Sequence, residues 1–407
     1  MKIAQDSMNI ALTRRASLLG LATIAVAGRA KLALASAPTA QRLVVVLLRG
    51  ALDGMAAVVP YGDPNLQSLR AALVPPQSTL LDLGGFFAFH PALKNLHALY
   101  QQNEVLPVHA IAGPYRTRSH FEAQDFLQTG IDQVGITSGW LNRLIAELPS
   151  GGVTGQGLAV GMGMPLLLRG PTPVASYAPA GFAKPSPALY ANIAALNRAD
   201  PVFGPAIAEG LRAARFDRAT LDAPSMDDAA DHTMAAPPQA YGFPALARAA
   251  GTLLAAPGGP RIAAFQLEGW DTHGNQINLL HAPLADLDAG IATLRTAMGP
   301  AWANTTILVI TEFGRTARIN GTHGTDHGTA TVAFLAGGCV AGGKIRTTWP
   351  GLNPTQLFQN RDLAPTADIR SLAKGVIQAQ FHLTPAALAR VFPNSSDAAP
   401  MAGLLRV

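Results

Sequence analysis

The sequence has 407 residues, a formal net charge of +5 at pH 7 and only 14% charged residues. No basic block and no stripe of interleaved basic and aromatic residues follows residue 37, which argues against a nucleic-acid partner. Cys339 is the only cysteine, so no intrachain disulfide can form and stability has to come from an apolar core.

The amino terminus predicts an export signal. Arg14-Arg15 precedes a mildly apolar run to Ala30, and Ala35-Ser36-Ala37 has the small-x-small form of a signal-peptidase site. The run is shorter than the ~20 residues of a membrane-spanning helix, so we expect no stable span in the mature chain. Residues 1–37 are therefore predicted to be a twin-arginine signal peptide, with the twin-arginine export machinery as partner and a periplasmic or secreted mature protein. A basic amphipathic arm is the alternative interpretation.

Removing residues 1–37 changes the charge and leaves a long domain. The segment holds five of the Lys and Arg residues and one Asp, so the mature chain has a formal net charge of +1. Residues 38–407 exceed the usual size of a single core, about 250–300 residues. This length leads us to expect one large domain with an inserted subdomain or loop region at about 170–260. Between 217 and 240, Pro237-Pro238 and several acids interrupt all periodicity.

Continuous apolar runs of strand length predict a buried sheet. Most of the runs lack strict alternation of apolar and polar residues, so they fit strands buried on both faces. In chain order they occupy 43–48, 105–112, 158–168, 262–267, 306–311 and 331–336. Apolar residues recur at helical spacing after Pro91 and after Pro283, and a further helix is predicted over 121–129. This alternation predicts an α/β fold, a mostly parallel central sheet with helices on both faces and functional loops at the carboxyl ends of the strands.

Acids and imidazoles follow or precede several of these strands. Asp53 comes shortly after the first strand, in a glycine-bounded turn, and Glu312 comes directly after the strand at 306–311. Asp271 and His273 follow the strand at 262–267. Such oxygen and nitrogen donors bind Zn, Mn or related divalent ions.

The last of these motifs, Gly324-Thr325-Asp326-His327-Gly328, lies just before the strand at 331–336. Each motif also has a purely structural interpretation. Asp271-Thr272-His273 fits a helix cap, Glu312 with Arg315 fits a buried ion pair, and the last motif fits a tight turn.

A second kind of chemistry is predicted around Ser119. Arg116 and Arg118 lie just before this hydroxyl, ahead of the helix at 121–129, an arrangement that suits an anion at a helix amino terminus. Ser119 is equally interpreted as an N-cap, with Glu122 three residues later completing a capping box.

The combined motif set resembles a known family. The motifs are the twin-arginine start, Arg49-Gly50-Ala51-Leu52-Asp53-Gly54, Phe89-His90-Pro91, Ser119-His120-Phe121-Glu122-Ala123-Gln124-Asp125, Ser138-Gly139-Trp140-Leu141-Asn142-Arg143, Gly269-Trp270-Asp271-Thr272-His273, Thr311-Glu312-Phe313-Gly314-Arg315-Thr316 and Gly324-Thr325-Asp326-His327-Gly328. Together they resemble the exported bacterial proteins of the domain of unknown function 1501 family. That family is grouped with the alkaline phosphatase and sulfatase superfamily, whose members bind one or two divalent metals and cleave or transfer phosphate or sulfate esters.

The resemblance implies a set of metal ligands. Asp53 matches the superfamily's first metal-binding aspartate, Asp271 with His273 resembles its later ligands at a shorter spacing, and Glu312 stands in for a ligand carboxylate. Phe313 occupies the place of a ligand histidine and cannot coordinate a metal, while His327 resembles the final histidine. Asp326 is the residue that restores the missing ligand in this interpretation. The implied cofactor is a divalent metal, with Zn, Mn, Mg and Ca as the alternatives.

The resemblance also implies a catalytic set and two classes of function. Ser119, or else Thr117, matches the superfamily's nucleophile, beside His120, and Arg116 or Arg118 would clamp the non-bridging oxygens of an anionic ester. This implies an alkaline phosphatase/sulfatase-like fold and metal-dependent hydrolysis of phosphate or sulfate esters in the periplasm. The alternative is a noncatalytic binding or accessory protein with a degenerate site, holding a small anionic ester or a glycan.

Overall fold

A computed structural model of the chain divides it after Thr39, and all described residues belong to the second unit. The structure describes residues 40–133, 135–149, 156–161, 163–178 and 242–406. The predicted signal peptide at 1–37 lies outside the described residues, and so does most of the predicted insertion at about 170–260. Within the described part, no helix combines the length and the apolar character needed to cross a membrane.

The described residues form one large sheet of eight strands in the order β11-β5-β10-β9-β1-β8-β6-β7. The strands are β1 (Arg42–Leu48), β5 (Val105–Ala112), β6 (Gly157–Val160), β7 (Ala175–Tyr177), β8 (Ile262–Leu267), β9 (Thr305–Thr311), β10 (Thr331–Ala336) and β11 (Ala367–Asp368). The central strand β1 pairs in parallel with β8, Leu43 opposite Ile262, and with β9, Leu43 opposite Thr306. The predicted, mostly parallel sheet is therefore confirmed.

One strand of the sheet, β10, runs in the opposite direction to its neighbours β9 and β5. Its amino end therefore lies at the same edge of the sheet as the carboxyl ends of the parallel strands. The loops that follow β5, β8 and β9 meet the loop that precedes β10 at this edge. The candidate site is built there.

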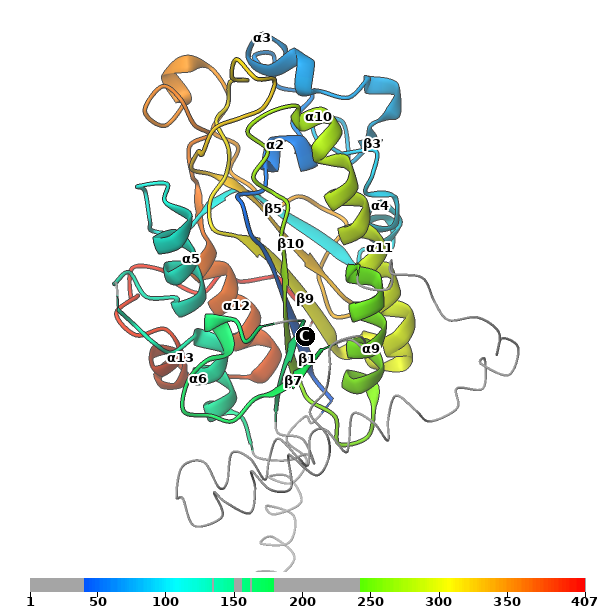
Figure 1. Cartoon of the computed structure of the whole chain (residues 1–407), viewed down its shortest axis with the longest axis vertical. Helices are drawn as coiled ribbons and strands as arrows, with labels where there is room; N and C mark the ends of the chain where they lie inside the picture. Colours follow the sequence, from blue (N-terminus) through cyan, green and yellow to red (C-terminus); the bar gives the residue numbers. More distant parts are fainter. Residues whose placement is uncertain (1–39, 134, 150–155, 162, 179–241, 407) are drawn as a thin grey trace, which may run out of the picture. The chain divides into compact units, whose positions relative to one another are not determined.

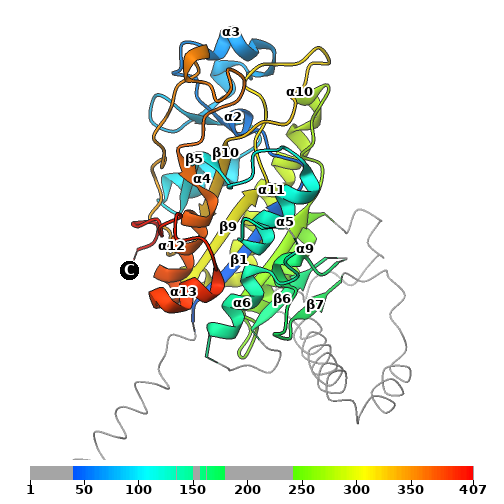
Figure 2. The same ribbon diagram turned by 90° about the vertical axis from the view of Figure 1, so that its left-hand side faces the viewer.

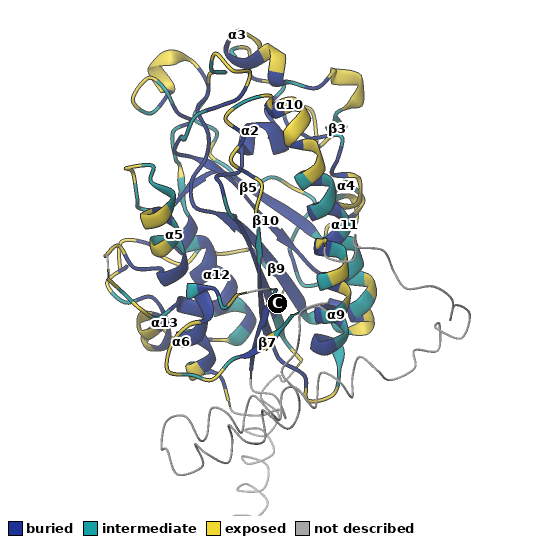
Figure 3. Cartoon of the chain, in the orientation of Figure 1, coloured by how far each residue is buried: buried dark blue, intermediate teal, exposed yellow. Residues whose placement is uncertain are grey.

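The helices cover both faces of the sheet (Figures 1 and 2). On one face lie α4 (Lys94–Gln101), α9 (Phe243–Ala255) and α11 (His281–Met298), and on the other lie α5 (His120–Thr129), α6 (Trp140–Glu147), α12 (Ile369–Phe381) and α13 (Pro385–Val391). Side chains of β1 alternate between the faces, so Val44 and Val46 join the core under α9 and α11, whereas Val45 joins the core under α6 and α12. This explains why the strand sequences are apolar without a break, and Figure 3 shows the strands buried between helices with exposed outer faces.

Smaller elements pack beyond the carboxyl edge of the sheet. They are α2 (Gly54–Ala57), α3 (Leu66–Arg70), α10 (Gln276–Leu279) and a three-stranded sheet in the order β2 (Val58–Val59), β4 (Ala88–Phe89), β3 (Leu81–Asp82). Short 3-10 helices occur at Ala71–Leu73, Gln77–Thr79, Leu166–Leu168, Gly299–Asn304 and Pro354–Gln356.

Two local predictions differ from the structure. The predicted strand at 158–168 ends at Val160, because Gly161 adopts φ +119° and breaks the extended backbone. Ser119 does occupy the N-cap position of α5, but its side chain makes no hydrogen bond to the helix N–H groups, so the predicted capping box does not form.

A histidine in the sheet is held in its neutral form. His109 of β5 is fully buried, its Nε2–H donates to the carbonyl of Val58 over 3.0 Å, and its Nδ1 accepts from the N–H of Ala110 over 2.7 Å. Both ring nitrogens are thus satisfied without a second proton. Burial lowers the pKa of His109 to about 4.

This pKa makes folding stability depend on pH. Between pH 6.5 and pH 4 the unfolded chain binds a proton at His109 that the folded chain does not bind, so stability is lost as the pH falls through that window. At 1.36 kcal/mol per pKa unit the full loss is about 3 kcal/mol. We expect His109→Gln, which keeps one donor and one acceptor but does not titrate, to lose correspondingly less stability between pH 7 and pH 4.5 in urea denaturation. Parallel losses in the variant and the wild type would contradict the assignment.

Candidate metal centre

Three imidazoles and one carboxylate converge at the carboxyl edge of the sheet. They are His120 at the start of α5, Asp271 and His273 after β8, and His327 before β10. His327 Nε2 lies 2.9 Å from His120 Nε2 and 2.9 Å from His273 Nε2. Asp271 Oδ1 lies 3.1 Å from His273 Nε2, 3.4 Å from His327 Nε2 and 3.6 Å from His120 Nε2. His120, Asp271 and His327 thus form a group whose donor atoms all lie within 4.8 Å of one another.

The opposite nitrogen of each ring faces an oxygen acceptor. Nδ1 of His120 lies 2.7 Å from Glu312 Oε1, and Nδ1 of His327 lies 3.0 Å from the carbonyl oxygen of Arg118. Nδ1 of His273 lies 3.4 Å from Asp326 Oδ1. A carbonyl or carboxylate oxygen only accepts, so these contacts assign the proton to Nδ1 and leave a lone pair on each Nε2. Metal-binding histidines are oriented in the same way by hydrogen bonds at their second nitrogen.

The converging lone pairs are suited to binding a cation. His327 Nε2 faces two other Nε2 atoms at 2.9 Å, and a proton on one ring can bridge only one of these two contacts. Zn–N bonds of about 2.0–2.1 Å in a tetrahedral site place neighbouring ligand atoms about 3.3 Å apart. Within the group of His120, Asp271 and His327 the separations are 2.9, 3.4 and 3.6 Å, which bracket that value, so these three donors fit a divalent metal.

Buried Arg315 supplies a competing positive charge. Its Nη2 donates to Asp271 Oδ1 over 2.5 Å, and its Nη1 lies 3.5 Å from His273 Nε2. Burial favours the neutral form of Asp271, but opposing interactions, led by the positive charge of Arg315, outweigh it and lower the pKa of the carboxyl below its usual value. Asp271 is therefore ionised, and its Oδ1 both accepts from Arg315 and lies near the three imidazole Nε2 atoms, where it could bind a metal.

The imidazole pKa values are shifted in opposite directions. The hydrogen bond with Glu312 raises the pKa of His120, whereas burial and then the charge of His120 lower the pKa of His327. Burial by itself would raise the pKa of the Glu312 carboxyl, but its hydrogen bonds, the most important of them with His120, lower that pKa below its usual value. The shifts therefore disfavour a second positive charge on His327 beside His120.

Glu312, predicted as a metal ligand, lies behind His120 instead. It is buried, and Oε1 accepts from His120 Nδ1, from the N–H of Gly50 over 2.9 Å and from Gln124 Nε2 over 3.2 Å. The backbone of Gly50 adopts φ +120°, and a Cβ there would lie 2.6 Å from the backbone N of Asp271. Glycine therefore lets the loop after β1 approach both Glu312 and the Asp271 loop.

Phe313 and Asp326 line the same centre. The Phe313 ring packs against His120 and His327, with ring centroids 4.9 Å and 5.2 Å apart, and so forms an apolar wall where the family resemblance placed a ligand. Asp326, predicted to restore that ligand, accepts from Asn320 Nδ2 and faces His273 Nδ1. It orients an imidazole, as Glu312 does.

Asp53 differs most from its predicted role. It is fully buried, caps α2 by accepting from the N–H groups of Met55 and Ala56, and pairs with buried Arg70 through both oxygens. Gln276 Nε2 donates to its Oδ2 over 2.6 Å. These four partners occupy the carboxylate, so in this structure Asp53 is an internal anchor and not part of the His120, Asp271, His327 group.

The anchor at Asp53 nevertheless reaches the site. Gln276 Oε1 accepts from the hydroxyls of Thr272, between Asp271 and His273, and of Thr325, beside Asp326. A buried chain of hydrogen bonds therefore holds both ligand loops from behind. Gln276 and Arg70 carried no recognisable motif, and only the fold brings them to Asp53.

The predicted catalytic residues are dispersed. Arg118 directs its guanidinium to Asp362 and Gln359, and Arg116 directs its own to the carbonyls of Gly113 and Tyr115, so neither is aimed at an ester above the imidazoles. Ser119 stands directly before His120. His120, expected in the catalytic set, lies among the candidate metal donors instead. Its position after β5, at the carboxyl edge of the sheet, could have indicated this placement.

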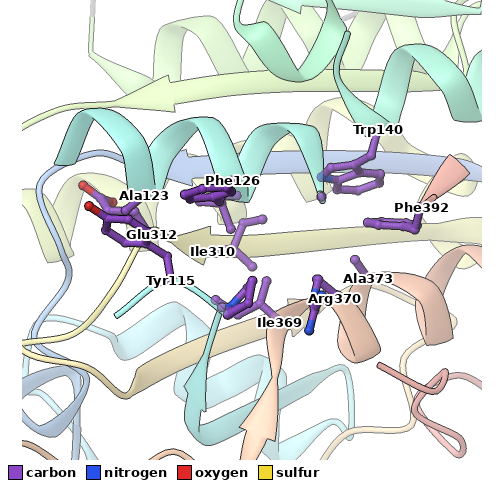
Figure 4. A pocket seen from close by; sticks show the side chains of 14 residues that line it. Tyr115, Ala123, Phe126, Trp140, Ile310, Glu312, Ile369, Arg370, Ala373 and Phe392 are labelled. Carbon is purple, nitrogen blue, oxygen red and sulfur yellow. The ribbon is translucent and has the colours of Figure 1, made fainter. Parts of the chain in front are cut away.

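A narrow cavity borders Glu312, the residue that lies behind His120 (Figure 4). It is lined mainly by apolar side chains, among them Phe126, Ile310 and Phe392, with Glu312 at one end, and holds about 20 Å³. That is room for about one water molecule. The centre is therefore open to larger molecules only on the solvent side, where the side chains of Asp271 and His273 are each 47% exposed.

Comparison with known proteins identifies the family. Residues 97–392 match the family model of DUF1501, described as a protein of unknown function. The chain belongs to this family, as its motifs predicted. A search of curated proteins finds no match.

Solved structures with a similar fold come from the alkaline phosphatase superfamily and the sulfatases. A protein of the alkaline phosphatase superfamily from Vibrio parahaemolyticus is 11% identical with a TM-score of 0.36, over 84% of this chain and 66% of that chain, just under two thirds of its length. The C-terminal periplasmic domain of EcEptC from Escherichia coli, in complex with Zn, is 11% identical with a TM-score of 0.35, over 74% and 73%. BT1596, a 2-O GAG sulfatase, is 12% identical with a TM-score of 0.34, over 84% and 71%. Similarity at this level carries no argument about activity.

The internal role of Asp53 predicts a stability effect. Asp53→Ala leaves Arg70 buried without its partner, which typically costs about 3–5 kcal/mol of the free energy of unfolding. We expect urea denaturation to show a loss of this size, and a smaller loss when Arg70→Met is added. Asp397→Ala, which removes an ion pair whose carboxylate is 67% exposed, is the control and should cost at most about 1 kcal/mol. A variant of unchanged stability that no longer binds metal would restore Asp53 to the ligand set.

Proposed function

We propose that the protein is an exported, metal-dependent hydrolase of phosphate or sulfate esters. One observation carries the proposal: three imidazole Nε2 atoms and Asp271 Oδ1 converge while the second nitrogen of each imidazole faces an oxygen acceptor. Such an arrangement costs free energy unless a cation lies among the donors. The class of ester follows from the resemblance of the sequence motifs.

The residues of the centre have distinct tasks. His120, Asp271 and His327, with His273 beside them, would hold the metal, which when bound supplies a Lewis acid that lowers the pKa of a nearby hydroxyl or water and stabilises developing negative charge. Glu312 and Asp326 keep the protons of His120 and His273 on Nδ1. Phe313 keeps water away from one side of the rings.

Ser119 is the nucleophile in this proposal. It adjoins His120 at the amino end of α5, where its hydroxyl is not used to cap the helix. The amino end of a helix favours the negative charge that develops on a serine oxygen or an ester. Arg116 and Arg118 do not take part as clamps, because their guanidinium groups are directed elsewhere.

A noncatalytic binding protein is the second candidate. The ion pair of Arg315 with Asp271 favours it, since a guanidinium already neutralises the one carboxylate among the converging donors. In that case the imidazoles would bind a small anionic ester or glycan when protonated, without turnover.

Metal binding separates the two candidates. We expect the purified chain to bind a divalent metal, tested with Zn, Mn, Mg and Ca, and to hydrolyse aryl phosphates or aryl sulfates only when loaded. His327→Ala should weaken binding by more than about 100-fold, because removing only a hydrogen-bond partner of a metal ligand already costs about 10–100-fold. His281→Ala, an exposed histidine at the start of α11, is the matched control and should bind as the wild type does.

Ser119→Ala tests the catalytic step separately. Hydrolysis should fall by about 10³-fold or more while metal and ligand binding remain. Turnover that survives this substitution would remove Ser119 from the mechanism. A chain that binds none of the four ions and turns over no ester would overturn the hydrolase proposal and leave the binding protein.

Export is tested at the twin arginines. We expect the wild-type chain to appear in the periplasm cleaved after Ala37, and the double variant Arg14→Lys, Arg15→Lys to remain uncleaved in the cytoplasm. Cell fractionation with amino-terminal sequencing measures both. A wild-type chain that keeps residues 1–37 in the cytoplasm would contradict this assignment.

A further inference from the structure

His327 is held at two atoms by the same group of residues. Its ring Nδ1 faces the carbonyl oxygen of Arg118 at 3.0 Å, and its own carbonyl oxygen accepts from Arg361 Nη1 over 2.8 Å. One contact controls the ring and the other controls the backbone from which the ring projects. Together they set the direction of Nε2.

Both arginines are bound to one buried carboxylate. Asp362 is fully buried, and its Oδ2 accepts from Arg118 Nε over 2.9 Å and from Arg118 Nη2 over 2.6 Å. Its Oδ1 accepts from Arg361 Nη1 over 3.1 Å. The hydroxyl of Thr329, two residues after His327, also donates to Oδ2 over 2.8 Å. Asp362 therefore joins three segments that surround His327.

Asp362 provides the negative charge that Arg118 and Arg361 both need. Two guanidinium groups share a single carboxylate, so without Asp362 the like charges of Arg118 and Arg361 would face each other with nothing between them. Arg118 is also partly buried, with 21% of its side chain exposed. Loss of the carboxylate would thus make Arg118 and Arg361 repel each other and weaken the two hydrogen bonds that they make with His327.

Three residues near Asp362 adopt left-handed backbone conformations that their surroundings have to hold in place. Arg118 adopts φ +63°, and Gln359 and Asn360, in the turn just before Asp362, adopt φ +55° and φ +53°. Non-glycine residues enter this left-handed region only when the surroundings hold them there. At Arg118 the conformation accompanies a carbonyl directed at His327, and Gln359 Oε1 accepts from Arg118 Nη2 over 2.7 Å.

We infer that Asp362 is a positioning residue for the metal centre, acting through Arg118 and Arg361 to keep the His327 proton on Nδ1 and its Nε2 directed at the other donors. The inference rests on the proposed function, because it assigns Asp362 a task at the same centre. The motif set does not include Asp362, and Arg118, expected to clamp an anion, serves His327 instead. A carboxylate 35 residues beyond the histidine thereby tunes a ligand it does not touch.

Zinc affinity tests this role. We expect Asp362→Asn and Asp362→Ala to weaken Zn²⁺ binding about 10–100-fold in competition with a chromophoric chelator, the effect typical of losing groups that orient a metal ligand. Asp63→Asn is the matched control, because Asp63 is also buried and accepts from Trp349 and from the N–H of Leu352 without contacting the centre. Arg361→Gln should give a smaller loss, and it serves if Asp362→Ala does not fold.

A second measurement reads His327 directly. In nitrogen-edited NMR of the protein without added metal, we expect His327 of the wild type and of Asp63→Asn to carry its proton at Nδ1, and Asp362→Ala to show a mixture with Nε2. Wild-type zinc affinity in Asp362→Asn, while His327→Ala loses binding, would overturn the inference. Should the wild type bind no metal, the proposed function fails, and an unchanged His327 tautomer in Asp362→Ala would then overturn the positioning role as well.

Discussion

The hydrogen bond at each imidazole Nδ1 is the interaction on which the centre depends. Glu312, Asp326 and the carbonyl of Arg118 accept from three rings that come from three different loops. Because these acceptors hold the proton on one side of each ring, the lone pairs on the other side are brought together. The centre is therefore defined as much by the groups behind the imidazoles as by the donor atoms themselves.

Buried carboxylates at this edge of the sheet hold loops in place. Asp53 reaches the loops of Asp271 and Asp326 through Gln276, and Asp362 reaches His327 through two arginines. A buried ion pair contributes little net stability compared with apolar packing, yet removing one partner is costly. In this fold such pairs restrict which loop conformations are compatible with the folded state.

Sequence patterns predicted much of the fold and part of the centre. The uninterrupted apolar runs identified β1, β5, β8, β9 and β10, since strands buried on both faces need no alternation. Asp271, His273 and His327 were found because they stand at strand ends. Asp53 and Glu312 satisfied the same rule and yet lie behind other groups. The position of a residue in the sequence identifies the edge of the sheet at which its side chain lies. It does not show whether an arginine or a histidine binds that side chain and so prevents it from facing the metal donors.

The sequence by itself determined the strands, their alternation with helices and the loops that carry acids and imidazoles. It could do so because a strand buried on both faces needs a continuous run of apolar residues, which is visible in the local sequence. Only the tertiary structure decided which of those residues face one another. The reversed direction of β10 brings His327 to the carboxyl edge, and contacts between residues as distant as His120 and Glu312, or Arg118 and Asp362, divide the charged groups into donors and supports. These are pairings across nearly 200 residues or more, and no local pattern encodes them.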